Sequence, residues 1–148
     1  MEVPYTIDAM HLKKNVFDSI ISLLMDVKGK TKDGLKSCRD LVSMKIRSKL
    51  HPVDQGNGKF KLPSASYNLT LEEKRDLCSC LRGIKVPTGL SSNIRKLVSL
   101  KDLSIRGYNA HDCHMMMTVF LAVAIRAIKP VFVKMVVTRM VYFFSKIL

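Results

Sequence analysis

Apolar residues recur along the first third of the chain at intervals of three and four, which is the spacing of an amphipathic helix. This pattern predicts a first helix from His11 to Asp26, which Asp8 can cap at its start and which ends near Gly29. A second, shorter helix is predicted from about Asp33 to Ile46. The residues on the two apolar faces are Phe17, Ile20, Ile21 and Leu24 in the first helix and Leu35, Cys38, Leu41 and Val42 in the second.

The apolar periodicity stops after the second predicted helix. Residues 47–66 show no regular apolar spacing and contain Pro52, Gly56, Gly58 and Pro63, residue types that are typical of turns. A stretch of this length without secondary structure of its own is long for a compact domain. We therefore predict that 47–66 is a loop that links two parts of the chain.

The clearest helix start in the chain is Thr70-Leu71-Glu72-Glu73, which has the spacing of a capping box. The Thr70 hydroxyl can accept a hydrogen bond from the N–H of Glu73, while the Glu73 carboxylate reaches back to the N–H of Thr70. The third predicted helix has Leu77, Leu81 and Ile84 on one face and Gly83 and Pro87 at its end.

Helical patterning continues to the C-terminus with one interruption. A short helix is predicted from Ser91 or Ser92 through Val98, and an extended or turn segment follows at Ser104–Tyr108. A long helix from about Asn109 to Lys129 precedes Pro130, which is suited to be the first residue of a final helix. The predicted fold is mainly α, with room for one short hairpin near Ser104–Tyr108. It is either a small helical domain or an incomplete helical fragment of a larger protein.

Composition narrows the class of protein. The chain has 148 residues, about the size of one domain, and 47% of them are hydrophobic, which excludes a disordered basic tail. With 25 Lys and Arg against 12 Asp and Glu, the net charge is +13, which favours nucleic acid as a partner. Trp is absent and aromatic residues make up 7%, so stacking platforms for single-stranded nucleic acid are scarce.

Two apolar stretches near the C-terminus raise the question of membrane insertion. Met115–Ile125 is too short to cross a bilayer, and the stretch from Val131 to Leu148 is interrupted by three cations, Lys134, Arg139 and Lys146. We interpret both as buried or amphipathic helices, and we expect no membrane location; a short membrane hairpin is the alternative. Residues 1–10 lack the basic start and apolar run of a signal peptide, so none is predicted.

The positive charge is concentrated in two segments. Eight basic residues and two acids lie between Lys28 and Lys49, and after Asp112 there is no acid at all. The first of these segments would attract phosphate groups and give salt-dependent, sequence-independent affinity for DNA. The alternative is an ordinary solvated surface, and the sequence leaves both open. The candidate nucleic-acid-binding residues are Lys28, Lys30, Lys32, Lys36 and Arg39.

His111-Asp112-Cys113-His114 is the candidate segment for metal binding. On a helix His111 and His114 share a face, and both can bind zinc. A structural zinc site has four ligands and two more are not evident, so we predict no metal and no other cofactor. The alternative is that His111 and Asp112 cap the helix while Cys113 and His114 pack. The cysteines and Met115–Met117 are interpreted as small or adaptable apolar residues, mostly in the core.

Several motifs follow one another in order along the chain, and together they resemble plant CACTA (En/Spm-type) transposon proteins. Two of them are IDAMHLKKNV at Ile7–Val16, similar to the family's L-D-x-M-H-x-E-K-N-V, and His111–His114, similar to its S-H-D-C-H. The others are GKTKDG at Gly29–Gly34, YNLTLEEK at Tyr67–Lys74, KVPTGLSSNI at Lys85–Ile94 and AIR at Ala124–Arg126. Two departures are Lys13, where the family has an acid, and Phe120–Val123, where it has a polar residue and Pro.

The resemblance implies that the chain is a junction piece of such a protein. Residues 1–46 correspond to the tail of the transposase core, 47–66 to a linker, and 67–148 to a truncated helical domain of unknown function that follows the core. The family's full proteins are thought to cut DNA in an RNase-H-like fold through metal-bound carboxylates dispersed along the chain. Most of that core is absent, so the resemblance implies no enzyme activity. Asp18, Asp26 and Asp33 are expected to lie on the surface.

Two hypotheses about function follow. The first is a transposon-derived, catalytically inactive fragment, located in the nucleus by resemblance, that contacts DNA without sequence preference or pairs with a full-length transposase-like protein or with itself. The second is a helical interaction module that buries Met115–Leu148 against another chain, because exposed apolar surface of that extent marks an interface.

Overall fold

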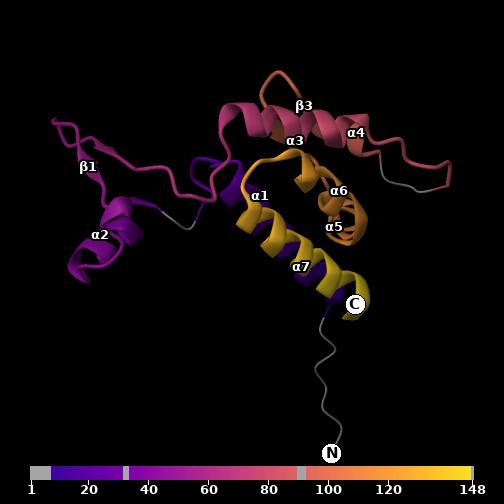
Figure 1. Ribbon diagram of the computed structural model, residues 1–148, viewed down its shortest axis with the longest axis horizontal. Coiled ribbons are helices and arrows are strands. Elements are labelled where there is room, and N and C mark those ends of the chain that lie inside the picture. The colour runs from indigo at the N-terminus through magenta and orange to yellow at the C-terminus, as the bar shows by residue number, and fades with distance from the viewer. Residues whose placement is uncertain (1–7, 32–33, 90–92, 148) are drawn as a thin grey trace, which may run out of the picture. The chain divides into compact units, whose positions relative to one another are not determined.

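The fold is mainly helical, as the sequence predicts (Figure 1). We describe a computed structural model in which residues 8–31, 34–89 and 93–147 are placed. Besides helices, these residues form two small antiparallel sheets of two strands each. The chain divides into two compact units, one made of Met1–Ile20 and Leu69–Leu148 (unit 1) and the other of Ile21–Asn68 (unit 2). The division into 1–46, 47–66 and 67–148 that the resemblance implies stays a prediction.

Helix α1 spans Ala9–Leu24 and is capped as predicted. The Asp8 carboxylate accepts hydrogen bonds from the backbone N–H groups of Met10 and His11, each at 3.1 Å. The helix ends before Gly29, because Asp26 adopts a left-handed conformation with φ of 51°. The Val27 N–H then donates to the Ser22 carbonyl at 3.0 Å, and the Asp26 N–H donates to the Leu23 carbonyl at 3.3 Å. This is the Schellman arrangement that usually employs glycine.

Helix α2 spans Leu35–Ser43 and ends in the same way. Lys45 takes the left-handed position with φ of 56°. The Ile46 N–H donates to the Leu41 carbonyl at 3.1 Å and the Lys45 N–H to the Val42 carbonyl at 3.0 Å. The first two helices therefore both end on non-glycine residues in a conformation that glycine tolerates better.

The predicted loop 47–66 contains regular structure, so that prediction is wrong in detail. A short 3-10 turn, η1 (Ser48–Leu50), precedes a hairpin of β1 (Val53–Asp54) and β2 (Phe60–Lys61), in which Val53 pairs with Lys61. The Asp54 carboxylate accepts from the Gly56 N–H at 2.8 Å, and Gly56 and Gly58 have positive φ angles. The strands are two residues long, too short for periodicity to reveal, although the Gly-Asn-Gly tip is a turn signal.

Helix α3 (Leu71–Gly83) confirms the predicted capping box. The Glu73 N–H donates to the Thr70 hydroxyl at 3.3 Å, and the Glu73 carboxylate accepts from the Thr70 N–H at 2.9 Å. Glu73 also accepts from the backbone N–H of Lys129 at 3.3 Å, so the cap joins segments far apart in sequence. These hydrogen bonds, the Thr70 N–H first, hold the pKa of the buried Glu73 carboxyl below its ordinary value.

A short hairpin lies where one was expected. Helix α4 (Ile94–Leu97) leads into β3 (Val98–Ser99), which pairs antiparallel with β4 (Ser104–Ile105). The predicted start of the short helix, Ser91 or Ser92, lies outside the described residues. The predicted extended segment Ser104–Tyr108 thus begins as the second strand of a hairpin.

The long helix predicted at 109–129 forms as one run with a change of winding inside it. Asn109 caps α5 (Ala110–Met115), five residues of π-helix follow as η2 (Met116–Phe120), and α6 (Leu121–Ala124) and η3 (Ile125–Ala127) complete the run. The Thr118 hydroxyl donates to the His114 carbonyl at 2.8 Å within the π turn. Pro130 is not the first helical residue as predicted but directly precedes α7 (Val131–Ile147), where its carbonyl accepts from the Lys134 N–H at 3.1 Å.

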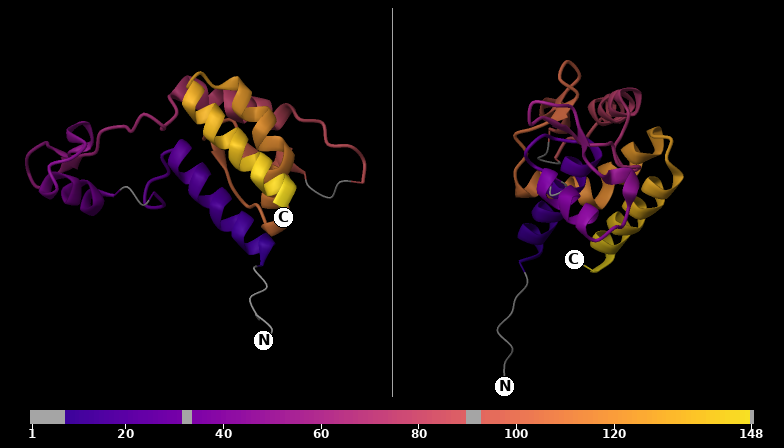
Figure 2. Two further views of the ribbon diagram at one scale, coloured as in Figure 1. Left: turned by 60° about the horizontal axis from the view of Figure 1, so that its bottom comes forward. Right: turned by 90° about the vertical axis from the view of Figure 1, so that its left-hand side faces the viewer.

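The core of unit 1 lies where α7 packs against η2 and α6, and where α6 and η3 pack against α3. Figures 1 and 2 show α7 returning alongside the run from α5 to α6. Met116 and Met117 are fully buried there, as predicted. The buried apolar residues of these elements are Leu77, Cys78 and Leu81 of α3, Phe120, Leu121, Ala124 and Ile125 of the long run, and Val133, Val137, Val141 and Phe144 of α7.

Candidate functional site

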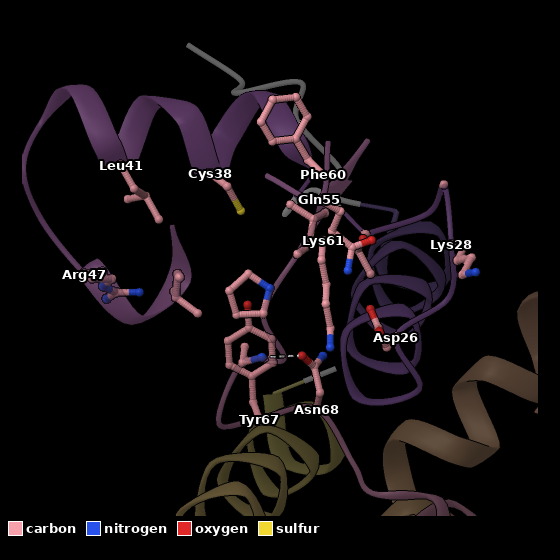
Figure 3. A pocket seen from close by; sticks show the side chains of 17 residues that line it. Asp26, Lys28, Cys38, Leu41, Arg47, Gln55, Phe60, Lys61, Tyr67 and Asn68 are labelled. Atoms are coloured by element: carbon pink, nitrogen blue, oxygen red, sulfur yellow. Dashed lines mark hydrogen bonds between the residues drawn. The ribbon is translucent and has the colours of Figure 1, made fainter. Parts of the chain in front are cut away.

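A cavity of about 730 Å³ lies within unit 2 (Figure 3). Its wall comes from the segment after α1, from α2 and the turn that follows it, and from the hairpin with its return to Asn68. This volume is within the range of binding sites for small ligands. The lining is mixed, with apolar contributions from Cys38, Leu41, Leu50 and Phe60 and polar ones from Gln55, Tyr67 and Asn68.

Cations outnumber acids around this cavity. Lys28, Arg47 and Lys61 line it together with one acid, Asp26. Figure 3 shows Lys61 in the middle of the view, extending towards Asn68, with Arg47 below Leu41 at one end and Lys28 at the other. The three cations come from three different segments, so the fold of unit 2 brings them together.

Local structure explains where each cation lies. Lys28 follows the Schellman end of α1, and Arg47 stands between α2 and η1 in a left-handed conformation with φ of 48°. The position of Lys61 is determined by its pairing with Val53 in the β1–β2 hairpin. The return of the chain is held by Asn68, whose side-chain amide donates to the Leu23 carbonyl at 2.7 Å and accepts from the Ala65 N–H at 2.6 Å.

The predicted nucleic-acid-binding residues differ in their position relative to the cavity. Lys28 lines the cavity, whereas Lys30 and Lys36 are exposed outside its lining. The Arg39 guanidinium lies 4.8 Å from the centre of the Phe60 ring, a cation–π contact that joins α2 to the hairpin. Lys32 lies outside the described residues.

The sequence alone does not indicate that Arg47 and Lys61 belong to one cluster. Arg47 belongs to the basic segment Lys28–Lys49, so composition alone could have included it. Lys61 could be found only by recognising the hairpin, because the pairing of β1 with β2 carries it to the cavity.

The whole of unit 2 is basic at its surface. Nine lysines and arginines are exposed between 21 and 68 in the part of the chain that the structure describes, against three exposed aspartates. Among those described residues, none of the nine cations is within ion-pair distance of an acid. Cations without internal ion pairs are available for phosphate groups from outside the molecule.

The candidate metal-binding histidines have a different neighbourhood in unit 1. The rings of His111 and His114 are stacked with centres 6.4 Å apart, so they do share a face. The Nδ1 atom of His114, however, lies 2.9 Å from the ammonium of Lys13. Within the described ranges, no group of three or more His, Cys, Asp and Glu side chains is placed to hold a metal ion. Asp112 closes a second capping box with Asn109.

Lys13 is a buried lysine, with 1% of its surface exposed. Burial lowers its pKa, because the charged ammonium is removed from water. The pKa of His114 is also lowered, first by burial and then by the positive charges of Lys13 and His111. The arrangement favours a neutral imidazole that accepts a hydrogen bond from Lys13. Lys13 thus lies against the segment His111–His114.

The remaining titratable groups of this region play structural roles. Tyr108 donates to the Asp18 carboxylate at 2.5 Å and packs edge-on against Phe17. Of the aspartates expected at the surface, Asp18 is half-buried, Asp26 is exposed, and Asp33 lies outside the described residues. Burial, with a contribution from Asp18, raises the pKa of the Cys113 thiol to about 12. Burial likewise raises the pKa of Cys78. Thiols of this kind are unreactive, in agreement with their interpretation as core residues.

Among the helices of the described residues, none has the length and apolar character needed to cross a membrane. Comparison of the chain with protein-family models, with curated proteins and with solved structures gives no match.

Proposed function

We propose that unit 2 binds the phosphate backbone of DNA without sequence preference. The observation that carries the proposal is the set of nine exposed cations in its described residues, three of which, Lys28, Arg47 and Lys61, converge on one cavity. Phosphate contacts by lysine and arginine supply affinity but no sequence information, and the affinity falls as salt is added. A binding role of this kind requires no catalytic group.

We place the centre of the proposed DNA contact at the cavity. Lys28, Arg47 and Lys61 all line it, so a DNA backbone that enters the cavity would meet cations from three segments. Lys30 and Lys36, outside the lining, would extend the contact to neighbouring phosphates. Arg39 is partly committed to Phe60 and would contribute less than its charge suggests.

We also propose that the chain derives from a CACTA-type transposon protein and acts in the nucleus. The support is the order of the resembling motifs along the sequence. A further support is that two of these motifs, 101 residues apart, meet in the contact between Lys13 and His114. A derived fragment that binds DNA or pairs with a full-length relative fits the proposed binding role.

If the cavity residues contact DNA, replacing them should weaken binding more than the loss of three positive charges elsewhere in the chain. We expect the triple variant K28Q/R47Q/K61Q to bind random duplex DNA about tenfold more weakly or worse. The slope of log affinity against log salt should flatten by about 0.9 for each phosphate that the variant no longer neutralises. Fluorescence anisotropy across a salt series measures both quantities on the full chain.

A matched variant controls for net charge. K85Q/K96Q/K101Q removes three exposed cations from unit 1 and should change affinity and slope little. K30Q/K36Q tests two sequence-predicted residues outside the cavity and should give an intermediate loss. Equal losses in the two triple variants would show that total charge alone drives binding, and would overturn the assignment to unit 2.

A further inference from the structure

Helix α7 is apolar on both sides, although one side alone faces the core. Its inner residues, Val133, Val137, Val141 and Phe144, are 3–5% exposed and belong to the contact with η2 and α6. Its outer side also carries large apolar residues, exposed by 46–77%: Val131, Phe132, Met135, Val136, Tyr142 and Phe143. Exposed apolar side chains gathered on one element are typical of a surface that contacts another molecule.

The outer residues form one continuous stripe. Positions 132, 135, 136, 139, 142, 143 and 146 follow the spacing i, i+3, i+4, i+7, i+10, i+11 and i+14, which keeps them on one face of a helix. Two of these positions are the exposed cations Arg139 and Lys146. They are separated by seven residues, or about 10 Å along the axis. The stripe therefore alternates apolar layers with single positive charges.

The charges indicate what covers the stripe. The chain has no Asp or Glu after Asp112, so α7 contributes no acid that could pair with Arg139 or Lys146. A second copy of this chain would place cations opposite cations, which disfavours self-association. A lipid surface would receive two cations in the middle of the inserting face, whereas interfacial helices carry their cations on the polar side.

We propose that the outer face of α7 docks an acidic amphipathic helix of a partner protein. Apolar side chains of that helix would pack between Phe132, Met135 and Tyr142, and carboxylates seven residues apart would meet Arg139 and Lys146. The contact resembles one seam of a coiled coil, in which charged residues on the seam fix register and choice of partner. This surface belongs to unit 1 and is independent of the proposed DNA contact.

Designed peptides test the proposal on the full chain. One peptide is a 21-residue amphipathic helix with Leu at its seam positions and Glu at two seam positions seven apart. The second peptide has Lys in place of both Glu residues. We expect the Glu peptide to bind the protein and the Lys peptide to bind about tenfold more weakly or not at all.

Charge reversal separates specific docking from attraction to a basic protein. The variant R139E/K146E should exchange the preference, losing about tenfold in affinity for the Glu peptide and gaining affinity for the Lys peptide. The matched variant K96E/K101E changes the net charge equally, away from α7, and should retain the original preference. Equal losses in both variants would overturn the proposal.

Two further measurements decide between the occupants. Phe132→Ser with Phe143→Ser should abolish binding of the Glu peptide without altering thermal unfolding, because both side chains are half exposed. Sedimentation of the unmodified chain should show a monomer. Dimers that Phe132→Ser with Phe143→Ser abolishes would identify a second copy as the occupant instead. Binding to phosphatidylserine vesicles that R139E/K146E abolishes, with no binding of either peptide, would identify a membrane surface and equally overturn the proposal.

Discussion

Lys13 is the residue whose position is least expected from its chemistry. It is fully buried, and its ammonium lies against a neutral acceptor, the Nδ1 atom of His114, rather than an acid. Burying a charge without an opposite charge is unfavourable, and the lowered pKa values of both Lys13 and His114 express this cost. The pair therefore makes the stability of unit 1 sensitive to pH.

The sign of this dependence follows from the lowered pKa of His114. In the unfolded chain the imidazole takes up a proton near pH 6.5, whereas in the folded chain it does so only at lower pH. The stabilising contribution is therefore complete above about pH 6.5 and is lost as the pH falls towards the folded pKa. We expect the free energy of unfolding to decrease over that interval, as measured by denaturant titration at several pH values.

Lys13→Met is the substitution that tests the pair. It should raise the free energy of unfolding at pH 7 by about 1 kcal/mol, because a buried charge is replaced by an apolar chain of similar size. It should also reduce the loss of stability on acidification, since the Lys13 charge is one cause of the lowered His114 pKa. The control H114Q should remove that part of the pH dependence. A destabilised Lys13→Met variant with an unchanged pH profile would contradict this account.

At the scale of elements, the ends of α1 and α2 place non-glycine residues in a left-handed conformation that their side chains disfavour. Both helices end in Schellman motifs, but the left-handed position is filled by Asp26 in one and by Lys45 in the other. Asp tolerates this conformation better than most residues, whereas Lys does not. The strain therefore falls mainly on Lys45.

Replacing Lys45 by glycine should stabilise unit 2. Relief of the left-handed strain outweighs the extra freedom of the unfolded chain, and we expect a gain of about 0.5–1 kcal/mol. Lys36→Gly, inside the same helix, should instead cost about 1 kcal/mol. Hydrogen exchange of the α2 amides measures both changes locally. If the two substitutions shift exchange in the same direction, the left-handed geometry at Lys45 is not a source of strain.

At the scale of the whole molecule, the two units differ in how much they bury. Unit 1 holds most of the buried apolar residues. Among the described residues from 26 to 68, Cys38 alone is a buried apolar residue. Ile21, Leu24 and Met25, at the end of α1, are the other buried apolar residues in the described part of unit 2. Because buried apolar surface supplies most of the stability of a fold, the part of unit 2 that follows Met25 is held mainly by its caps, its hairpin and the contact of Arg39 with Phe60.

Native-state hydrogen exchange should reveal this difference. We expect amides of α2 and the β1–β2 hairpin to exchange through local opening at lower free energy than those of α3, α6 and α7. Duplex DNA should slow exchange in 26–68 and leave α7 unchanged, if unit 2 is the DNA-binding unit. Uniform protection across both units would show a single cooperative structure and contradict the division into units of unequal stability.

The sequence by itself determined the elements whose signals are local. The Asp8 cap, the Thr70–Glu73 capping box, the break at Pro130 and the apolar faces with Phe17, Leu77 and Met116 all depend on residues within a few positions of each other. Helical periodicity and capping act over one or two turns, so they can be read along the chain. The basic character of the segment from Lys28 to Lys49 is likewise a property of the sequence alone.

Only the tertiary structure decided which distant residues meet. The approach of Lys13 to His114, the bond of Tyr108 to Asp18 and the convergence of Lys28, Arg47 and Lys61 join segments that no periodicity relates. The same holds for the outer side of α7, since both of its sides are apolar and only the packing of Val133 and Val137 against η2 and α6 shows which one is covered. The type of a side chain determines which contacts and charges are chemically possible for it. Its burial and its neighbours determine which of them form, and both depend on the folded chain as a whole.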